Sequence, residues 1–134
     1  LAPENPEFMP AIGKQSYVAT STHSAATAAI TPEYRAQVAA SSIAPCREAG
    51  LVAAGFLEDS RSFTAIANSN GNFGYQTATS ADYTCTVRTE DGRGSGWVGR
   101  NVTDISQFDA ARDVGIAIRK ARESADARAL EPGQ

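Results

Sequence analysis

The chain has a single histidine, His23, and it is the first residue to test for chemistry. It lies within residues 19–29, a run made almost entirely of Ala, Ser and Thr. A catalytic base needs a partner group and a pocket, and nothing nearby in the sequence supplies either. The common zinc sites built on histidine need more than one such ligand, and no HExxH motif occurs. We therefore interpret His23 as a surface residue.

The two cysteines, Cys46 and Cys85, have neither CxxC nor zinc-finger spacing. We place Cys46 on a helix and Cys85 within a strand. A disulfide bridge and a reactive thiol are the functional alternatives. We favour two small, reduced core residues, because two cysteines are too few for a disulfide framework.

Residues 94–99 spell GxGxxG, the pattern of a dinucleotide-binding loop. That loop works by joining a strand to a helix whose N-terminus meets the pyrophosphate. Here the segment follows a turn and continues into residues 100–102, which we interpret as strand. We interpret the glycines as permitting a twisted strand or a close approach of another backbone. Ser95 lacks the flanking glycines of a GxSxG nucleophile elbow.

Two acidic pairs, Glu58-Asp59 and Glu90-Asp91, have the residue types of an acid/base site. Both fall where we predict hairpin turns, in which acidic residues are common. The Asn-Val-Thr sequence at residues 101–103 matches a glycosylation site, and we regard it as a chance match. We therefore predict no catalytic, cofactor-binding or metal-binding residue in this chain.

The first element that the sequence predicts is a helix starting at Thr31-Pro32-Glu33. This triplet combines a capping hydroxyl, proline in the first turn and an acidic side chain near the positive end of the helix dipole. The helix should run to about Ala49 and stop at Gly50. Pro45 lacks an amide hydrogen and should kink or end it.

Four strands follow in our interpretation. Residues 51–58 and 61–68 form a hairpin around a turn at Asp59-Ser60, and Asn70-Gly71 makes the next turn. Residues 72–89 carry apolar and Thr side chains on the odd positions, which is the period of a half-buried strand. We expect this long strand to bend near residues 79–81. Residues 95–102 form the fourth strand.

A final helix is expected to begin at Asp104 or Ser106, with an apolar stripe at helical spacing. Residues 1–30 hold three of the six prolines and read as an extended arm, ordered where large apolar side chains find a groove. Those side chains are Phe8, Met9, Ile12, Tyr17 and Val18. The predicted fold class is therefore α+β: an N-terminal arm, a helix, a four-stranded, mainly antiparallel meander with one long bent strand, and a helix.

Composition excludes several classes of protein. The chain has 134 residues, of which 42% are hydrophobic and 20% charged, and its formal net charge is −3. This is the size of one domain. No apolar run approaches the ~20 residues of a membrane span. No basic segment provides the electrostatic footprint of a nucleic-acid binder. We thus expect neither a membrane nor a nucleic acid as a direct partner.

Several segments together are similar to the central domain of the TldD/PmbA family, whose members are also called modulators of DNA gyrase. They are the stretch 65–71, which ends in an "ANSNG" turn, the Thr/Ser-rich strand at 77–80 and the "DGRGSGW" hairpin within 86–97. The flanks at residues 31–33 and 129–133 resemble the helix before this domain and the lead into the next one. The resemblance covers essentially the whole chain.

The resemblance implies a cytoplasmic protein three to four times longer than this chain. Such proteins are peptidases that act on peptides and unfolded segments, usually as dimers. One subunit type holds zinc on an HExxxH helix and a cysteine, and the other lacks the metal ligands. In both types that region follows the central domain, so no zinc ligand is expected here.

The resemblance also divides the chain. Residues 1–30 would be an arm from a preceding domain, 31–128 the central domain, and 129–134 the start of a link to a C-terminal domain. We expect this domain to scaffold the peptidase, or its metal-free partner, and to line its cleft. The alternative is a non-catalytic module that binds peptides or assembles by sheet-edge pairing, for which we single out the small-residue strands at 64–84 and 94–99.

Overall fold

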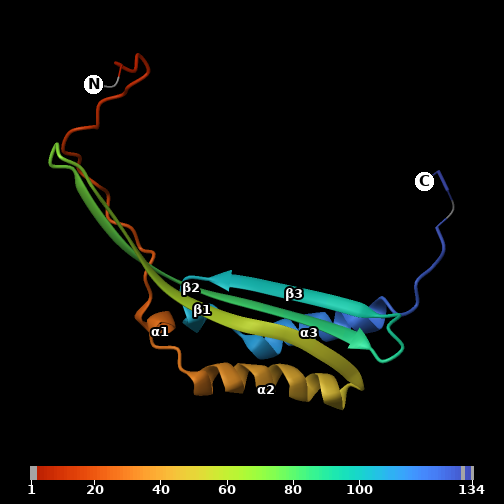
Figure 1. Cartoon of the computed structure of the whole chain (residues 1–134). Helices are drawn as coiled ribbons and strands as arrows, with labels where there is room; N and C mark the ends of the chain where they lie inside the picture. Colours follow the sequence, from red (N-terminus) through yellow and green to blue (C-terminus); the bar gives the residue numbers. More distant parts are fainter. Residues whose placement is uncertain (1–2, 131, 134) are drawn as a thin grey trace.

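The computed structural model describes residues 3–130 and 132–133. The fold is α+β: an antiparallel sheet in the order β1-β2-β3, with helices α2 and α3 covering one face (Figure 1). The elements in chain order are α1 (Ala25–Ala28), α2 (Pro32–Glu48), β1 (Leu51–Ala67), β2 (Phe73–Thr89), β3 (Ser95–Val102), the 3-10 helix η1 (Ile105–Gln107) and α3 (Ala110–Glu123).

The described residues form three strands rather than the predicted four, because β1 is continuous. The predicted turn at Asp59-Ser60 is wrong: these residues pair with Ala81 and Ser80 in the middle of the β1–β2 ladder. Tight two-residue hairpin turns need positive φ, and neither residue has it. Asp59 is instead held by an ion pair to Arg35 of α2, and the Ser60 and Ser80 hydroxyls are hydrogen-bonded at 3.0 Å.

Helix α2 starts and stops where the sequence predicts. The Thr31 side chain accepts a hydrogen bond from the Tyr34 amide at 3.3 Å, and Pro32 is the first helical residue. Past the C-terminus, Gly50 has φ +68°, a conformation that favours glycine. Of the two outcomes expected at Pro45, a kink or an end, the helix does not end there, since α2 continues to Glu48.

Helix α3 begins later than predicted. Asp104 caps the 3-10 helix η1, and the cap of α3 is Asp109, whose side chain accepts from the Arg112 amide at 3.0 Å. Phe108 lies between the two helices in an extended conformation. Its ring packs on Tyr83, with ring centroids 4.8 Å apart. This core contact lies between the two capping residues, Asp104 and Asp109. The sequence alone predicts a single helix start in this region.

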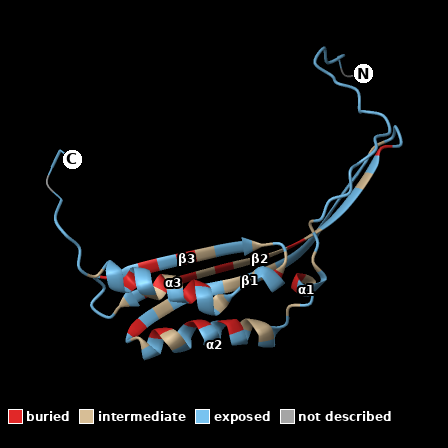
Figure 2. Ribbon diagram, turned by 180° about the vertical axis from the view of Figure 1, so that it is seen from behind, coloured by how far each residue is buried: buried red, intermediate tan, exposed pale blue. Residues whose placement is uncertain are grey.

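The core lies between the sheet and the two helices. Odd positions of β2 are buried from Thr79 to Val87, as the alternation predicts. Phe73 and Tyr75 follow the same alternation but are 65% and 62% exposed. The reason is geometric: the far half of the β1–β2 hairpin curves away beyond both helices (Figures 1 and 2).

The N-terminal arm is fastened to the body at one buried threonine. Thr27, in α1, donates from Oγ1 to the Thr103 carbonyl at 2.8 Å and accepts from the Ile105 amide at 2.8 Å. Thr79 of β2 donates to the same Thr103 carbonyl at 3.0 Å. The short helix α1, which the sequence did not predict, thus joins the arm to β2 and to the segment before η1.

Strand β3 and helix α3 are held together by a close backbone approach and a buried ion pair. A Cβ on Gly96 would meet the Ala117 carbonyl oxygen, so the GxGxxG segment is a strand pressed against a helix, as expected. Asp113 of α3 is fully buried and accepts two hydrogen bonds from Arg100 at 2.8 Å. Arg112 adds a third at 3.2 Å.

Candidate functional site

The structure places the histidine on the arm and the two cysteines in the core, so these residue types do not form one site. His23 is exposed on the arm. Cys46 and Cys85 are free thiols buried in the core, as predicted. Burial raises the pKa of the Cys46 thiol, and the neighbouring Cys85 adds to this, so it is held protonated. Across residues 3–130 and 132–133 no group of three His, Cys, Asp or Glu side chains can hold a metal ion.

The acidic pairs have structural partners. Glu58-Asp59 lies within β1, so the turn interpretation fails there. Glu90-Asp91 is at a turn, as expected, with Gly92 at φ +73°. Hydrogen bonds from the Thr89 hydroxyl and from Arg93 lower the pKa of Asp91 to about 2. A carboxylate that stays ionised at a solvent-exposed turn stabilises the turn and is unsuited to be a general acid.

The outer edge of β2, beyond the end of β3, is occupied by the arm. The Thr79 amide donates to the Thr22 carbonyl at 2.9 Å. The Thr22 hydroxyl donates to the Thr77 carbonyl at 2.8 Å. β3 pairs with β2 only as far as Ala81, so the arm takes over as the neighbour of β2 from there. The arm therefore satisfies main-chain hydrogen-bonding groups in this part of the small-residue stretch 64–84.

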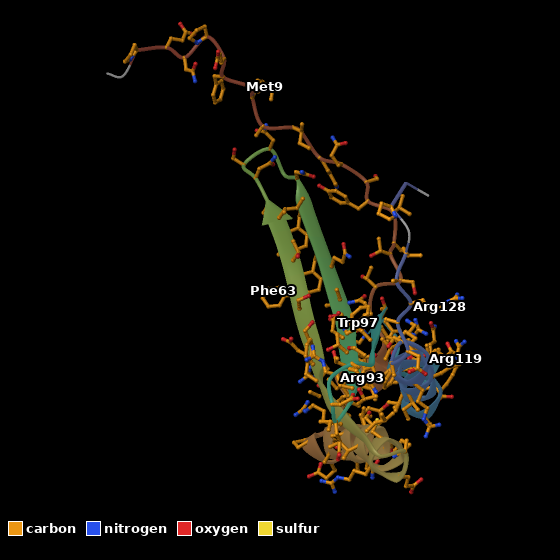
Figure 3. The ribbon with its side chains drawn as sticks, turned by 90° about the vertical axis from the view of Figure 1, so that its right-hand side faces the viewer. Met9, Phe63, Arg93, Trp97, Arg119 and Arg128 are labelled. Carbon is orange, nitrogen blue, oxygen red and sulfur yellow. The ribbon has the colours of Figure 1, made fainter. Side chains whose placement is uncertain are left out.

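Asparagines at the hairpin tip hold the arm further out, mostly through its main chain. Asn68 and Asn70 donate from their side chains to the Ile12 and Ala11 carbonyls, at 2.8 and 2.6 Å. Asn72 accepts from the Gln15 amide at 3.3 Å and from the Tyr17 hydroxyl at 2.9 Å. The arm and hairpin run side by side in Figure 3.

All five large apolar side chains that we named in the arm are more than half exposed. Tyr17 is the least exposed of them, at 51%, and its ring lies beside Gly74. Met9 and Val18 are 86% and 89% exposed, and Phe8 and Ile12 are also exposed. Side-chain amides, rather than apolar burial, thus order this segment. The sequence pattern identified the Asn-rich segment only as a turn and did not predict these contacts with the arm.

The outer edge of β3 is covered by side chains of α3. Ser95 donates its amide to the Ser124 hydroxyl at 2.9 Å, and its carbonyl accepts from the same hydroxyl at 3.0 Å. The Trp97 carbonyl accepts from the Lys120 ammonium at 3.0 Å. The second small-residue strand that we singled out, residues 94–99, is therefore also partly satisfied within the chain.

The outer edge of β1 borders a groove of about 620 Å³ beside α2. One wall is the consecutive run 53–57 of β1, and the other is α2, with Ala39 and Ile43. Tyr83 and Cys85 of β2 form the floor. The lining is mostly apolar. Sequence reasoning missed this groove, because it depends on small residues of α2 and β1 that meet only in the folded chain.

The structure defines an α+β domain built on a long antiparallel hairpin, with helices on one face of the sheet. The family model described as "PmbA/TldA metallopeptidase central domain" matches residues 18–129, and the chain belongs to this family. A search of curated proteins found no match, and neither did a search of solved structures. In the described part of the chain, no helix is long and apolar enough to cross a membrane.

Proposed function

We propose that this chain is the scaffold domain of a zinc-dependent peptidase, or of its metal-free partner subunit, that processes peptides and unfolded protein segments. The observation that carries the proposal is the family match over residues 18–129, whose description names both a metallopeptidase and its central domain. The fold of those residues is consistent with it: α2, α3 and the sheet form one continuous body. We place the protein in the cytoplasm and expect it to act as a dimer.

The residues described here do not fit a zinc ion. Zinc in proteins takes His, Cys or carboxylate ligands gathered in tetrahedral geometry. His23 lies on the arm, and both cysteines are core residues with their thiols against apolar side chains. We therefore assign zinc and the chemistry of peptide hydrolysis to a part of the protein outside this domain.

The proposed role of the domain is to hold its neighbours and to border the substrate cleft. Six large apolar side chains on the described strands are more than half exposed: Val52, Phe56, Phe63, Phe73, Tyr75 and Trp97. Figure 3 shows Phe63 pointing away from the hairpin. Apolar surface of this extent is typical of a site where another domain or subunit packs.

The test is made on the full-length protein. For a catalytic subunit we expect an HExxxH segment after this domain, about one zinc per chain and peptide hydrolysis that a chelator abolishes. For a partner subunit we expect no zinc, but hydrolysis once a zinc-containing subunit is added. A full-length protein that hydrolyses no peptide under either condition would refute the proposal.

A second candidate is a non-catalytic module that binds peptides at a sheet edge. The observation in its favour is the groove beside the β1 edge. A self-contained module should fold reversibly as a monomer, whereas a domain taken out of an enzyme should self-associate through its exposed apolar surface. Sedimentation of the 134-residue chain before and after refolding separates the two.

A further inference from the structure

The tip of the β1–β2 hairpin holds an asparagine that is followed by a glycine. Five asparagines occur in the chain, and Asn70 alone precedes a glycine. Asn70 and Gly71 are both exposed, and a Cβ added to Gly71 would meet nothing within 4 Å. The side-chain carbon Cγ of Asn70 is an electrophile, and the main-chain nitrogen of Gly71 is a nucleophile close to it along the chain. Because glycine carries no side chain, nothing shields this nitrogen.

An asparagine and a glycine in this order can undergo deamidation without an enzyme. The Gly71 nitrogen loses its proton and forms a bond to Cγ of Asn70, the Cγ–Nδ2 bond breaks, and ammonia leaves. The product is a cyclic imide. Water then opens the ring at either of its carbonyl carbons, which yields aspartate or isoaspartate. The net change replaces a neutral carboxamide by a carboxylate that is ionised at neutral pH.

In the folded chain, hydrogen bonds hold both reacting groups. Asn70 donates from Nδ2 to the Ala11 carbonyl of the arm at 2.6 Å. The Gly71 amide donates to the Asn68 carbonyl at 3.2 Å. A carboxamide whose nitrogen donates a hydrogen bond has a less electrophilic carbon, and a side chain fixed toward the arm is not free to turn to the Gly71 nitrogen. The docked arm therefore protects Asn70 from cyclisation.

The product of deamidation is unable to restore this contact. A carboxylate has no donor, so its oxygens would face the Ala11 carbonyl oxygen without a hydrogen between them. In isoaspartate the main chain also runs through the former side-chain carbon, which lengthens the turn. The neighbouring contacts of the arm depend on the same turn, because Asn68 donates to the Ile12 carbonyl and Asn72 accepts from the Gln15 amide.

We propose that Asn70 is a spontaneous deamidation site that the docked arm protects and whose product keeps the arm from docking again. A brief release of the arm is reversible, whereas a release that outlasts ring closure is not. The hairpin tip lies far from helices α2 and α3, so the core keeps its packing when the tip changes (Figure 1). The inference involves only the arm, the turn and water, and it is independent of zinc and of peptide hydrolysis.

The first experiment measures the rate of deamidation at neutral pH by mass spectrometry of proteolytic fragments that contain Asn70. Tyr17→Ala loosens the arm near the tip, because it removes the hydroxyl that donates to Asn72 at 2.9 Å and the ring beside Gly74. We expect deamidation about threefold or more faster than in the parent chain. Val18→Ala is the matched control, since Val18 is 89% exposed on the same arm, and its rate should equal that of the parent chain.

The second experiment tests the product. Asn70→Asp reproduces the aspartate form, and Ser69→Asp places the same charge at the adjacent exposed position while it keeps the Asn70 donor. Hydrogen exchange of the Gln15 amide, which donates to Asn72, reports docking of the arm. We expect exchange about threefold or more faster in Asn70→Asp than in the parent chain, and unchanged exchange in Ser69→Asp.

Faster deamidation in Tyr17→Ala, together with faster exchange in Asn70→Asp alone, supports the proposal. Several results overturn it. These are no deamidation at Asn70 in any of the chains, a rate that Tyr17→Ala leaves unchanged, and equal exchange at Gln15 in Asn70→Asp and the parent chain. Equally fast exchange in Ser69→Asp also overturns it, because charge at the tip, rather than loss of the Asn70 donor, would then release the arm.

Discussion

Replacing Asp113 by asparagine tests whether the ion pair between α3 and β3 stabilises the domain. Asp113 is fully buried and accepts two hydrogen bonds at 2.8 Å from Arg100 and one at 3.2 Å from Arg112. Asp113→Asn removes the charge and turns an amide NH2 toward guanidinium donors. Breaking a buried pair costs about 3–5 kcal/mol. The arginine side chains are 40% and 55% exposed and can regain water, so we expect about 2–3 kcal/mol.

The assay is urea denaturation followed by circular dichroism, at several pH values. Burial raises the pKa of Asp113, but the hydrogen bonds and charges of the two arginines outweigh this, and the folded-state pKa is lowered. The carboxylate therefore contributes its full stability above the unfolded-state pKa of about 4, and this contribution is lost as the pH falls through the lower folded value. The difference between parent and variant should be largest at neutral pH and should shrink below pH ~4.

The matched control is Glu123→Gln, which makes the same charge change in an exposed pair with Arg119 at 3.9 Å. An exposed pair of this kind contributes about 0.3–0.5 kcal/mol at most. If Asp113→Asn cost no more than Glu123→Gln, or if its cost were the same at pH 7 and pH 3, the assignment of Asp113 as a buried stabilising charge would be wrong.

Three further substitutions or treatments test the packing. Gly96→Ala should destabilise the domain by about 2–3 kcal/mol because its Cβ meets α3 backbone, whereas Gly115→Ala, with open space around it, should stabilise by about 0.5–1 kcal/mol; denaturant midpoints decide. An aromatic disulfide reagent should label neither Cys46 nor Cys85 in the folded chain and both after unfolding, and rapid labelling of the folded chain would contradict their burial. Thr27→Val removes two buried hydrogen bonds and should cost about 1–3 kcal/mol, with faster proteolysis of the arm than in the parent chain.

Local signals predicted the elements that local chemistry decides. The start of α2 follows from Thr31, Pro32 and Glu33, and the bounds of the strand 95–102 match β3 residue for residue. The false turn at Asp59 shows where such reasoning fails. An Asp-Ser pair suits a turn in isolation, but here Arg35 of α2 lies opposite and the long partner strand β2 continues past it. A contact across 24 residues thus overrides the local preference.

The groove beside β1 was harder to predict than the fold, because it too depends on contacts between residues that are far apart in the sequence. Composition drew attention to small residues in strands 64–84 and 94–99, yet the chain's own arm and α3 satisfy much of those edges. The groove lies instead beside β1, where Ala53 and Gly55 line it together with Ala39 of α2. Which of several small-residue edges stays open depends on what packs beside it, and a single sequence does not carry that information.

The anchoring of Thr27 has a consequence for how the chain is made. A ribosome releases Thr27 before the carbonyl that receives its hydroxyl, which belongs to a residue 76 positions later. The Thr27 anchor can therefore form only after Thr103, which follows β3, has emerged. Residues 19–29 around Thr27 are almost entirely Ala, Ser and Thr, so this stretch offers little apolar surface for other nascent chains to bind before the contact forms. A segment on the N-terminal side of α2 thus completes a contact that the chain can make only after β3 has been synthesised.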